Sequence, residues 1–163
     1  MTTQRDRHLE NLRSIRGQLF ALLEGMDYCL DWKPDPESWS AREVIYHLVD
    51  TPAGGLHTVL RGVLSGELRE FEVTPDQTNL TADRQTVDLA QAIQDLAGVL
   101  DGIEAAISRT DDDLIASRSA AAHLTARGRW EDRTAQMLLE GLFARHWRGH
   151  LEQLQELRET LGV

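Results

Sequence analysis

The sequence predicts an all-α protein that folds as a four-helix bundle in a single domain, residues 1–163. Its length is that of one ordinary globular domain and suffices to bury a core without disulfide bonds. Apolar residues recur three and four positions apart in four separate segments, which is the pattern of helices with one buried face. There is no internal repeat and no convincing strand pattern, so we expect helices packed on helices.

The first predicted helix covers residues 3–26. Thr3 and Asp6 resemble a capping pair, which satisfies free backbone amides at a helix start. The apolar stripe of this segment consists of Leu9, Leu12, Ile15, Leu19, Leu22, Leu23 and Met26. His8 lies beside a run of charged residues, and we expect it to face water.

The second predicted helix begins at Ser40, after a loop that contains two prolines. Ser40 and Glu43 match the S-x-x-E capping box, and Trp39 can pack on Val44 as the hydrophobic staple over it. Its apolar positions are Val44, Ile45, Leu48, Val49, Leu56, Val59, Leu60, Val63 and Leu64. Pro52 removes a backbone hydrogen bond and clashes with the preceding turn, so we expect a kink there or two consecutive short helices.

Two more helices follow, each after a polar connection. Residues 67–84 are polar and long for a loop, which suits a crossover that returns the chain along the bundle. The third predicted helix covers residues 84–108, with apolar positions Leu89, Ile93, Leu96, Leu100, Ile103 and Ile107. Residues 110–132 form an irregular connection with room for a short strand or a helical turn. The fourth predicted helix covers residues 132–160, with apolar positions Met137, Leu138, Leu142, Leu151, Leu154, Leu157 and the adjoining Leu161.

The composition argues against two classes of partner, nucleic acids and anionic membranes. The formal net charge is −10, and an acidic surface repels nucleic-acid phosphates and anionic membranes. No apolar run is long enough to span a bilayer, and the first residues lack the apolar core of a signal peptide. The single cysteine, Cys29, rules out an internal disulfide. We therefore expect a cytoplasmic protein without a nucleic-acid or membrane partner.

Three histidines form a candidate metal site. His146 and His150 are four residues apart, which on a helix returns a side chain to nearly the same face, about 6 Å further along the axis. They lie on or beside the apolar stripe of the last helix, which favours an inward-facing pair. We hypothesise that His47 from the second helix meets them and that all three bind one divalent metal ion. Alternatively, the histidines are a solvated pair or satisfied core residues.

Three imidazoles would leave at least one coordination position open. For zinc this is typical of a catalytic site, because structural zinc sites are closed by four protein ligands. Such a metal can acidify water or bind a thiolate. Nickel, iron and copper also accept imidazole, so residue types alone leave the metal undetermined.

The two segments that contain the candidate metal ligands also resemble those of a known superfamily. The segment Trp39–Leu48, which contains His47, and the pattern His146-x-x-x-His150-x-x-Gln153-Leu154 resemble the DinB/YfiT-like superfamily of four-helix-bundle metalloproteins. The resemblance implies an up-down-down-up bundle, a long crossover between the second and third helices, and frequent homodimers. It implies His47, His146 and His150 as the metal ligands, with zinc or nickel as the expected metals and iron as a further option.

The resemblance also implies activities. Relatives include S-transferases that use the low-molecular-weight thiols mycothiol or bacillithiol, maleylpyruvate isomerases, and proteins described as metal-dependent hydrolases. We therefore expect a metal-dependent transferase that activates such a thiol for attack on a small electrophilic substrate. A metal-dependent hydrolase, a non-catalytic metal-binding or ligand-binding dimer, and a metal-free interaction bundle remain alternatives.

Helical spacing indicates residues that support the ligands. Glu43 lies four residues before His47 and Asp50 three after it, so either carboxylate could orient the imidazole or act as a base. For Glu43 the capping box is the favoured interpretation. For Asp50 a role at the helix end before Pro52 is the alternative.

Three further side chains complete the predicted site. Gln153 lies three residues after His150, where its amide can hydrogen-bond a ligand or the neighbouring helix. Trp39 and Trp147 are candidate walls of the cofactor and substrate pocket. Packing at a helix start, or within the bundle, is the alternative for both.

Overall fold

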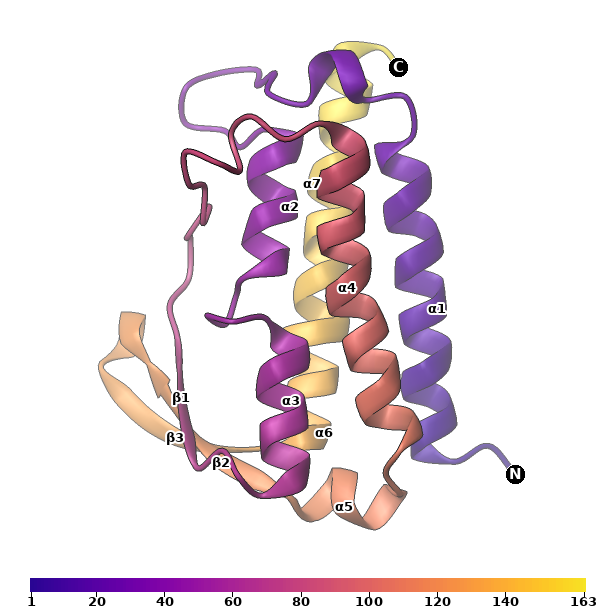
Figure 1. The fold of residues 1–163 in the computed structure, drawn as a ribbon, viewed down its shortest axis with the longest axis vertical. Coiled ribbons are helices and arrows are strands. Elements are labelled where there is room, and N and C mark those ends of the chain that lie inside the picture. Colours follow the sequence, from indigo (N-terminus) through magenta and orange to yellow (C-terminus); the bar gives the residue numbers. More distant parts are fainter.

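Four helical columns run side by side along the longest axis of the protein in the computed structural model, which describes residues 1–163 (Figure 1). The columns are α1 (Gln4–Leu23), α2 with α3 (Ala41–Val49 and Leu56–Ser65), α4 (Leu89–Ser108), and α6 with α7 (Ala135–Met137 and His146–Leu161). A π-helical segment, Leu138–Arg145, joins the last two. The predicted helical bundle is thus confirmed. No helix combines the length and apolarity needed to cross a bilayer.

Helix α1 begins at the predicted cap and ends earlier than predicted. Thr3 and Asp6 form a complete capping box, with each side chain accepting the other residue's backbone N–H at 3.1 Å. The helix stops at Leu23, before Gly25 with φ +77°, and a single 3₁₀ turn, Asp27–Cys29, follows.

The expectation that His8 faces water is wrong. Its side chain is 4% exposed, because His8 lies one turn before Leu12 on the buried stripe of α1. Burial lowers its pKa and favours the neutral imidazole.

The second column is broken where Pro52 predicted a kink or break. Ser40 caps α2 through the predicted box: its Oγ accepts the Glu43 N–H at 3.2 Å, and Glu43 Oε2 accepts the Ser40 N–H at 2.8 Å. Helix α2 ends at Val49. The chain resumes at α3 after Gly55, whose φ of +91° favours glycine. Two short helices therefore stack in one column (Figure 1).

A small three-stranded sheet at one end of the bundle corrects the all-α prediction (Figure 1). Its strands, in the order β1-β2-β3, are Glu70–Val73, Ser119–Leu124 and Arg129–Thr134. Strand β1 pairs parallel with β2, and β2 pairs antiparallel with β3. Strand β2 contains three consecutive alanines, which have low strand propensity, so tertiary pairing makes this sheet. The short helix α5, Asp112–Ser117, precedes it.

The sheet also shortens the predicted last helix. Residues up to Thr134 belong to β3, so the helix begins at Ala135 rather than at Asp132. Thr134 caps it by accepting the Met137 N–H at 3.1 Å. Similarly, α4 begins at Leu89 rather than Arg84, because Asp88 caps it through the Gln91 N–H.

The connection from α3 to α4 contains β1 and then runs along the outside of the bundle to the start of α4 (Figure 1). The buried Arg42 of α2 anchors its end. One guanidinium nitrogen, Nη1, donates to the carbonyls of Arg84 and Val87 at 2.8 and 2.6 Å, and Nε donates to Asp31 at 2.6 Å. This anchoring keeps residues 76–79 over α2, where they reach His47.

We expect Arg42→Met to lower the free energy of unfolding by about 2–3 kcal/mol, because two carbonyls and a carboxylate lose charge-assisted hydrogen bonds. Chemical denaturation measures this change. The control is Arg16→Met, which removes a half-exposed ion pair with Asp101 and should lower the free energy of unfolding by less than about 1 kcal/mol. Equal effects of the two substitutions would show that Arg42 does not anchor the connection.

Candidate metal centre

Three imidazoles from two helices, α2 and α7, meet within the bundle. His47 projects from α2, and His146 and His150 project from α7. The Nε2 atom of His146 lies 3.0 Å from the Nε2 of His47 and 3.0 Å from the Nε2 of His150. One nitrogen from each ring lies within 4.8 Å of the other two. The structure therefore brings together the three histidines that the sequence singles out.

Local sequence places each ring. The capping box at Ser40 sets where α2 begins and puts His47 in its second turn, on the side buried against the bundle. Helical periodicity places His146 and His150 one turn apart on one face of α7. Because α2 and α7 are packed neighbours, the two faces present their rings to each other.

The second nitrogen of each ring faces an oxygen that can only accept a hydrogen bond. His47 Nδ1 lies 2.6 Å from the Gln77 carbonyl, His146 Nδ1 lies 3.3 Å from the Leu142 carbonyl, and His150 Nδ1 lies 2.8 Å from Gln153 Oε1. These contacts favour the neutral tautomer in which each Nδ1 carries the proton. All three Nε2 atoms are then unprotonated lone-pair donors that point at one another.

In this tautomer the three Nε2 atoms cannot satisfy one another, because three lone pairs contain no proton to share. A cation between the rings would satisfy all three at once. Tetrahedral bonds of about 2.0–2.1 Å to one zinc ion would separate neighbouring nitrogen ligands by about 3.3–3.4 Å, a few tenths of an ångström more than the 3.0 Å seen for two of the pairs. The donor set therefore fits a divalent metal such as zinc.

Burial keeps the rings in their metal-binding form. Loss of solvation lowers the pKa of His47, His146 and His150, and it lowers that of His146 to about 4, with the two neighbouring imidazoles adding to the shift. The free imidazoles are thus neutral near pH 7. Neutral imidazole is the state that binds a metal ion.

The π-helical segment before α7 supplies one of the orienting carbonyls. The His146 N–H donates to the carbonyls of Gly141 and Phe143 rather than to that of Leu142, four residues back. The Leu142 carbonyl lies instead 3.3 Å from His146 Nδ1. π-helical turns are rare and frequent at functional sites, and no residue pattern in this segment predicts one.

Residues of the α3–α4 connection hold His47, and sequence reasoning missed them. Besides the Gln77 carbonyl, Thr51 Oγ1 lies 3.3 Å from His47 Nδ1, and Asn79 Nδ2 donates to Thr51 Oγ1 at 2.9 Å. Asn79 has φ of +57°, a conformation that asparagine tolerates better than most residues. The local sequence predicts only a turn, and no residue pattern predicts that a backbone carbonyl faces a histidine.

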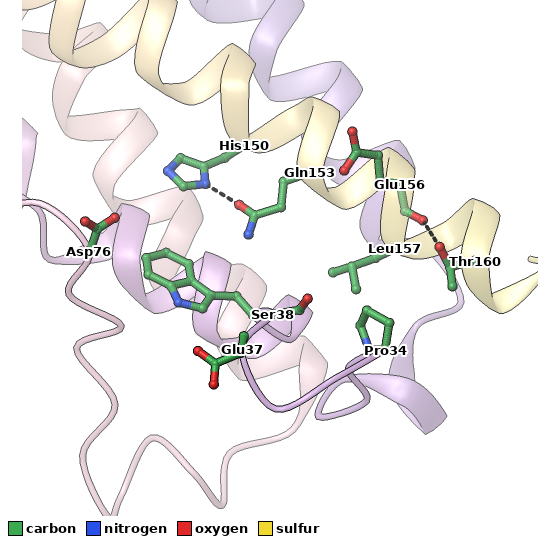
Figure 2. A pocket seen from close by; sticks show the side chains of 10 residues that line it. Pro34, Glu37, Ser38, Asp76, His150, Gln153, Glu156, Leu157 and Thr160 are labelled. Carbon is green, nitrogen blue, oxygen red and sulfur yellow. Dashed lines mark hydrogen bonds between the residues drawn. The ribbon is translucent and has the colours of Figure 1, made fainter.

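A pocket of about 560 Å³ adjoins the cluster (Figure 2). His150 belongs to both, because its Nε2 lies in the cluster and its ring lines the pocket. Trp39 also lines the pocket, stacked parallel to His150 at 6.0 Å and tilted against His47 at 4.9 Å. The lining residues are Pro34, Glu37, Ser38, Trp39, Asp76, His150, Gln153, Glu156, Leu157 and Thr160.

The remaining predicted site residues separate into two groups. Gln153 lies at the cluster and Trp39 at the pocket, as described above. Glu43, Asp50 and Trp147 form no hydrogen bond with the three histidines, and the structure gives each of them other contacts.

Each of these three has another role. Glu43 completes the Ser40 cap and pairs with Lys33 at 3.1 Å. Asp50 accepts the Gly54 N–H at 2.7 Å and pairs with Arg84 at 3.2 Å, which is the helix-end role. Trp147 is fully buried and packs edge-on against Phe143, since its position on α7 faces the core rather than the pocket.

The fold and this cluster define a class: helical-bundle proteins with a candidate three-histidine metal centre between two helices. Comparison with known proteins agrees with that class. The sequence model of the DinB superfamily matches residues 11–154, so the chain belongs to the DinB superfamily. The comparison with curated proteins found no match.

One solved structure shares the fold. It is described as "YfiT from Bacillus subtilis is a probable metal-dependent hydrolase with an unusual four-helix bundle topology". The two proteins are 21% identical, with a TM-score of 0.74, and the match covers 98% of this chain and 88% of YfiT. At this identity the likeness establishes the fold.

We expect Gln153→Leu to weaken metal affinity about 10- to 100-fold, because Gln153 accepts from His150 Nδ1 and fixes the orientation of that ring. Competition against a chromophoric chelator measures the affinity for zinc. The control is Gln155→Leu on the same helix, where the Gln155 side chain donates to Glu159. An affinity of Gln153→Leu equal to that of the control would rule out the orienting role.

Proposed function

We propose that this protein is a divalent-metal-dependent enzyme that acts on a small molecule in the pocket beside His150. The observation that carries the proposal is the convergence of three unprotonated Nε2 atoms next to an open pocket. His47, His146 and His150 would hold the metal, with zinc or nickel as the preferred ion and iron as a further option. When bound, the ion would lower the pKa of a thiol or water that occupies its open position.

A low-molecular-weight thiol is the proposed nucleophile, which makes the protein a thiol S-transferase. The sulfur would form a bond to an electrophilic carbon, the leaving group would depart with the electrons of its own bond, and the thiol proton would pass to solvent. The thiol must come from a second molecule, because Cys29 is 6% exposed and faces the Met26 carbonyl. The pocket of about 560 Å³ has room for a small ligand of this kind.

Hydrolysis is the second candidate function. It is favoured by the fold shared with YfiT, whose description is a probable metal-dependent hydrolase. Asp76 lines the pocket near His47 and offers a carboxylate that could take a proton from water. The same three histidines would serve either reaction.

We also propose the location, oligomeric state and partners of the protein. It would be a cytoplasmic homodimer without a nucleic-acid or membrane partner. The net charge of −10 supports the absence of polyanionic partners. The proposed dimer is supported by the family resemblance.

A paired assay tests the enzyme proposal. Zinc- or nickel-loaded protein is mixed with a low-molecular-weight thiol and 1-chloro-2,4-dinitrobenzene, and separately with p-nitrophenyl acetate. We expect turnover that disappears on chelation, returns with the metal, and falls at least about 100-fold in His146→Ala, because the ion and its bound nucleophile are lost. His123→Ala, on the sheet, is the matched control.

The two arms separate the candidate functions. Metal-dependent chloride release that requires the thiol supports the transferase, whereas ester cleavage without a thiol supports the hydrolase. Turnover that is equal in His146→Ala and wild type would overturn both.

A further inference from the structure

A second pocket lies between α3 and α4, and it shares no lining residue with the pocket beside His150. Its volume is about 300 Å³. The two helices pack side by side, and the short helix α5 follows the end of α4 (Figure 1). The lining residues are His57, Arg61, Leu64, Ser65, Gly102, Ala105, Ala106, Arg109, Thr110 and Leu114. None of the three candidate metal ligands is among them, so this pocket is separate from the candidate metal centre.

Small residues on α4 leave the space for this pocket. Gly102, Ala105 and Ala106 line it on one face of the helix, one turn apart. A side chain at Gly102 would collide with α3, because a Cβ there would lie 2.7 Å from the Cβ of His57. Small residues by themselves do not make a binding site, so the polar lining residues decide what the pocket can bind.

The fixed charge around this pocket is positive. Arg61 of α3 and Arg109 at the end of α4 line it, and no aspartate or glutamate does. Neither arginine forms an ion pair within the chain. The pocket is thus opposite in sign to the chain as a whole, whose net charge is −10. Guanidinium groups bind carboxylates well, because their N–H donors match the two carboxylate oxygens.

An unpartnered hydroxyl in the lining independently points to a ligand. Thr110 is 9% exposed, and its Oγ1 has no hydrogen-bond partner within the chain. The same is true of the buried Nδ1 atom of His57, which also lines this pocket. The chain has four such atoms, so half of them belong to residues around one pocket. An unpaired buried hydroxyl is costly, and a ligand oxygen that accepts its proton would remove this cost.

We propose that this pocket binds a small organic carboxylate with an apolar body, at a site separate from the metal centre. The carboxylate would accept hydrogen bonds from Arg61, Arg109 and the Thr110 hydroxyl. The apolar body would pack against Leu64 and Leu114. A volume of about 300 Å³ is at the small end of ligand pockets, which suits a single ring better than a nucleotide or a lipid.

An NMR titration of the full chain as purified tests this site. The probes, added at low salt, are benzoate, its neutral analogue benzamide, and inorganic phosphate, which lacks an apolar body. We expect benzoate to shift the backbone amide signals of Gly102, Ala105 and Thr110, and to bind at least about 10-fold more tightly than either other probe. Benzoate bound at a metal ion would instead shift the signals of residues around His150, so the two locations are distinguishable.

A charge-matched pair of variants tests the two arginines. Arg61→Gln combined with Arg109→Gln should weaken benzoate binding about 10- to 30-fold and leave benzamide binding unchanged. The control, Arg13→Gln combined with Arg127→Gln, removes two positive charges from exposed positions outside the pocket and should keep the wild-type affinity. Equal losses in the two double variants would show general attraction of anions and overturn the proposal.

Thr110→Val tests the hydroxyl and guards against a folding defect in the double variant. It should weaken benzoate binding about 3- to 10-fold without lowering the melting temperature, because the hydroxyl forms no hydrogen bond within the chain. A lower melting temperature with unchanged benzoate affinity would make Thr110 a packing residue and contradict its part in the site. The proposal as a whole fails if benzoate leaves the pocket signals unshifted, or if benzamide or phosphate binds there as tightly as benzoate.

Discussion

The orientation of three imidazoles is the constraint on which the account of this protein depends. Each Nδ1 lies beside an oxygen, of Gln77, Leu142 or Gln153, which favours the tautomer in which the Nε2 atoms carry no proton and face one another. Rotation of any ring would break its hydrogen bond and bury an unpaired polar atom. The protein therefore builds a preorganised lone-pair cluster, and burial keeps it neutral by lowering the pKa of all three histidines.

The α3–α4 connection and the π-helical segment position two of the oxygens that face the histidine rings. Gln77 belongs to the connection between α3 and α4, whose end is fixed by Arg42 and by the pairing of Arg84 with Asp50. In the π-helical segment the His146 N–H donates to the carbonyls of Gly141 and Phe143, and the Leu142 carbonyl lies beside the His146 ring. Asp50, which the sequence suggested as a base, pairs with Arg84. It thereby helps to fix the connection whose Gln77 carbonyl faces His47.

The sequence predicted the parts that repeat or that carry a local motif. Helical periodicity located the four columns, the capping box located the start of α2, and the spacing of His146 and His150 located a pair that the structure joins to His47. It did not predict the sheet, because the alanines of β2 have no strand signal and gain their structure from pairing with β1 and β3. It also missed the Gln77 carbonyl and the π-helical turn, since neither depends on a side-chain pattern. His8 was misplaced because neighbouring charges outweighed its position on the buried stripe.

Metal content of untagged protein tests the central claim most directly. Elemental mass spectrometry is applied to wild type, His146→Ala and His123→Ala, each as purified and after reconstitution with zinc or nickel followed by removal of free metal. We expect about one ion per chain in wild type and in His123→Ala, and little in His146→Ala, because loss of one of three ligands opens the centre. Little metal in wild type after reconstitution, or equal content in His146→Ala, would contradict the account and make the three histidines packing residues.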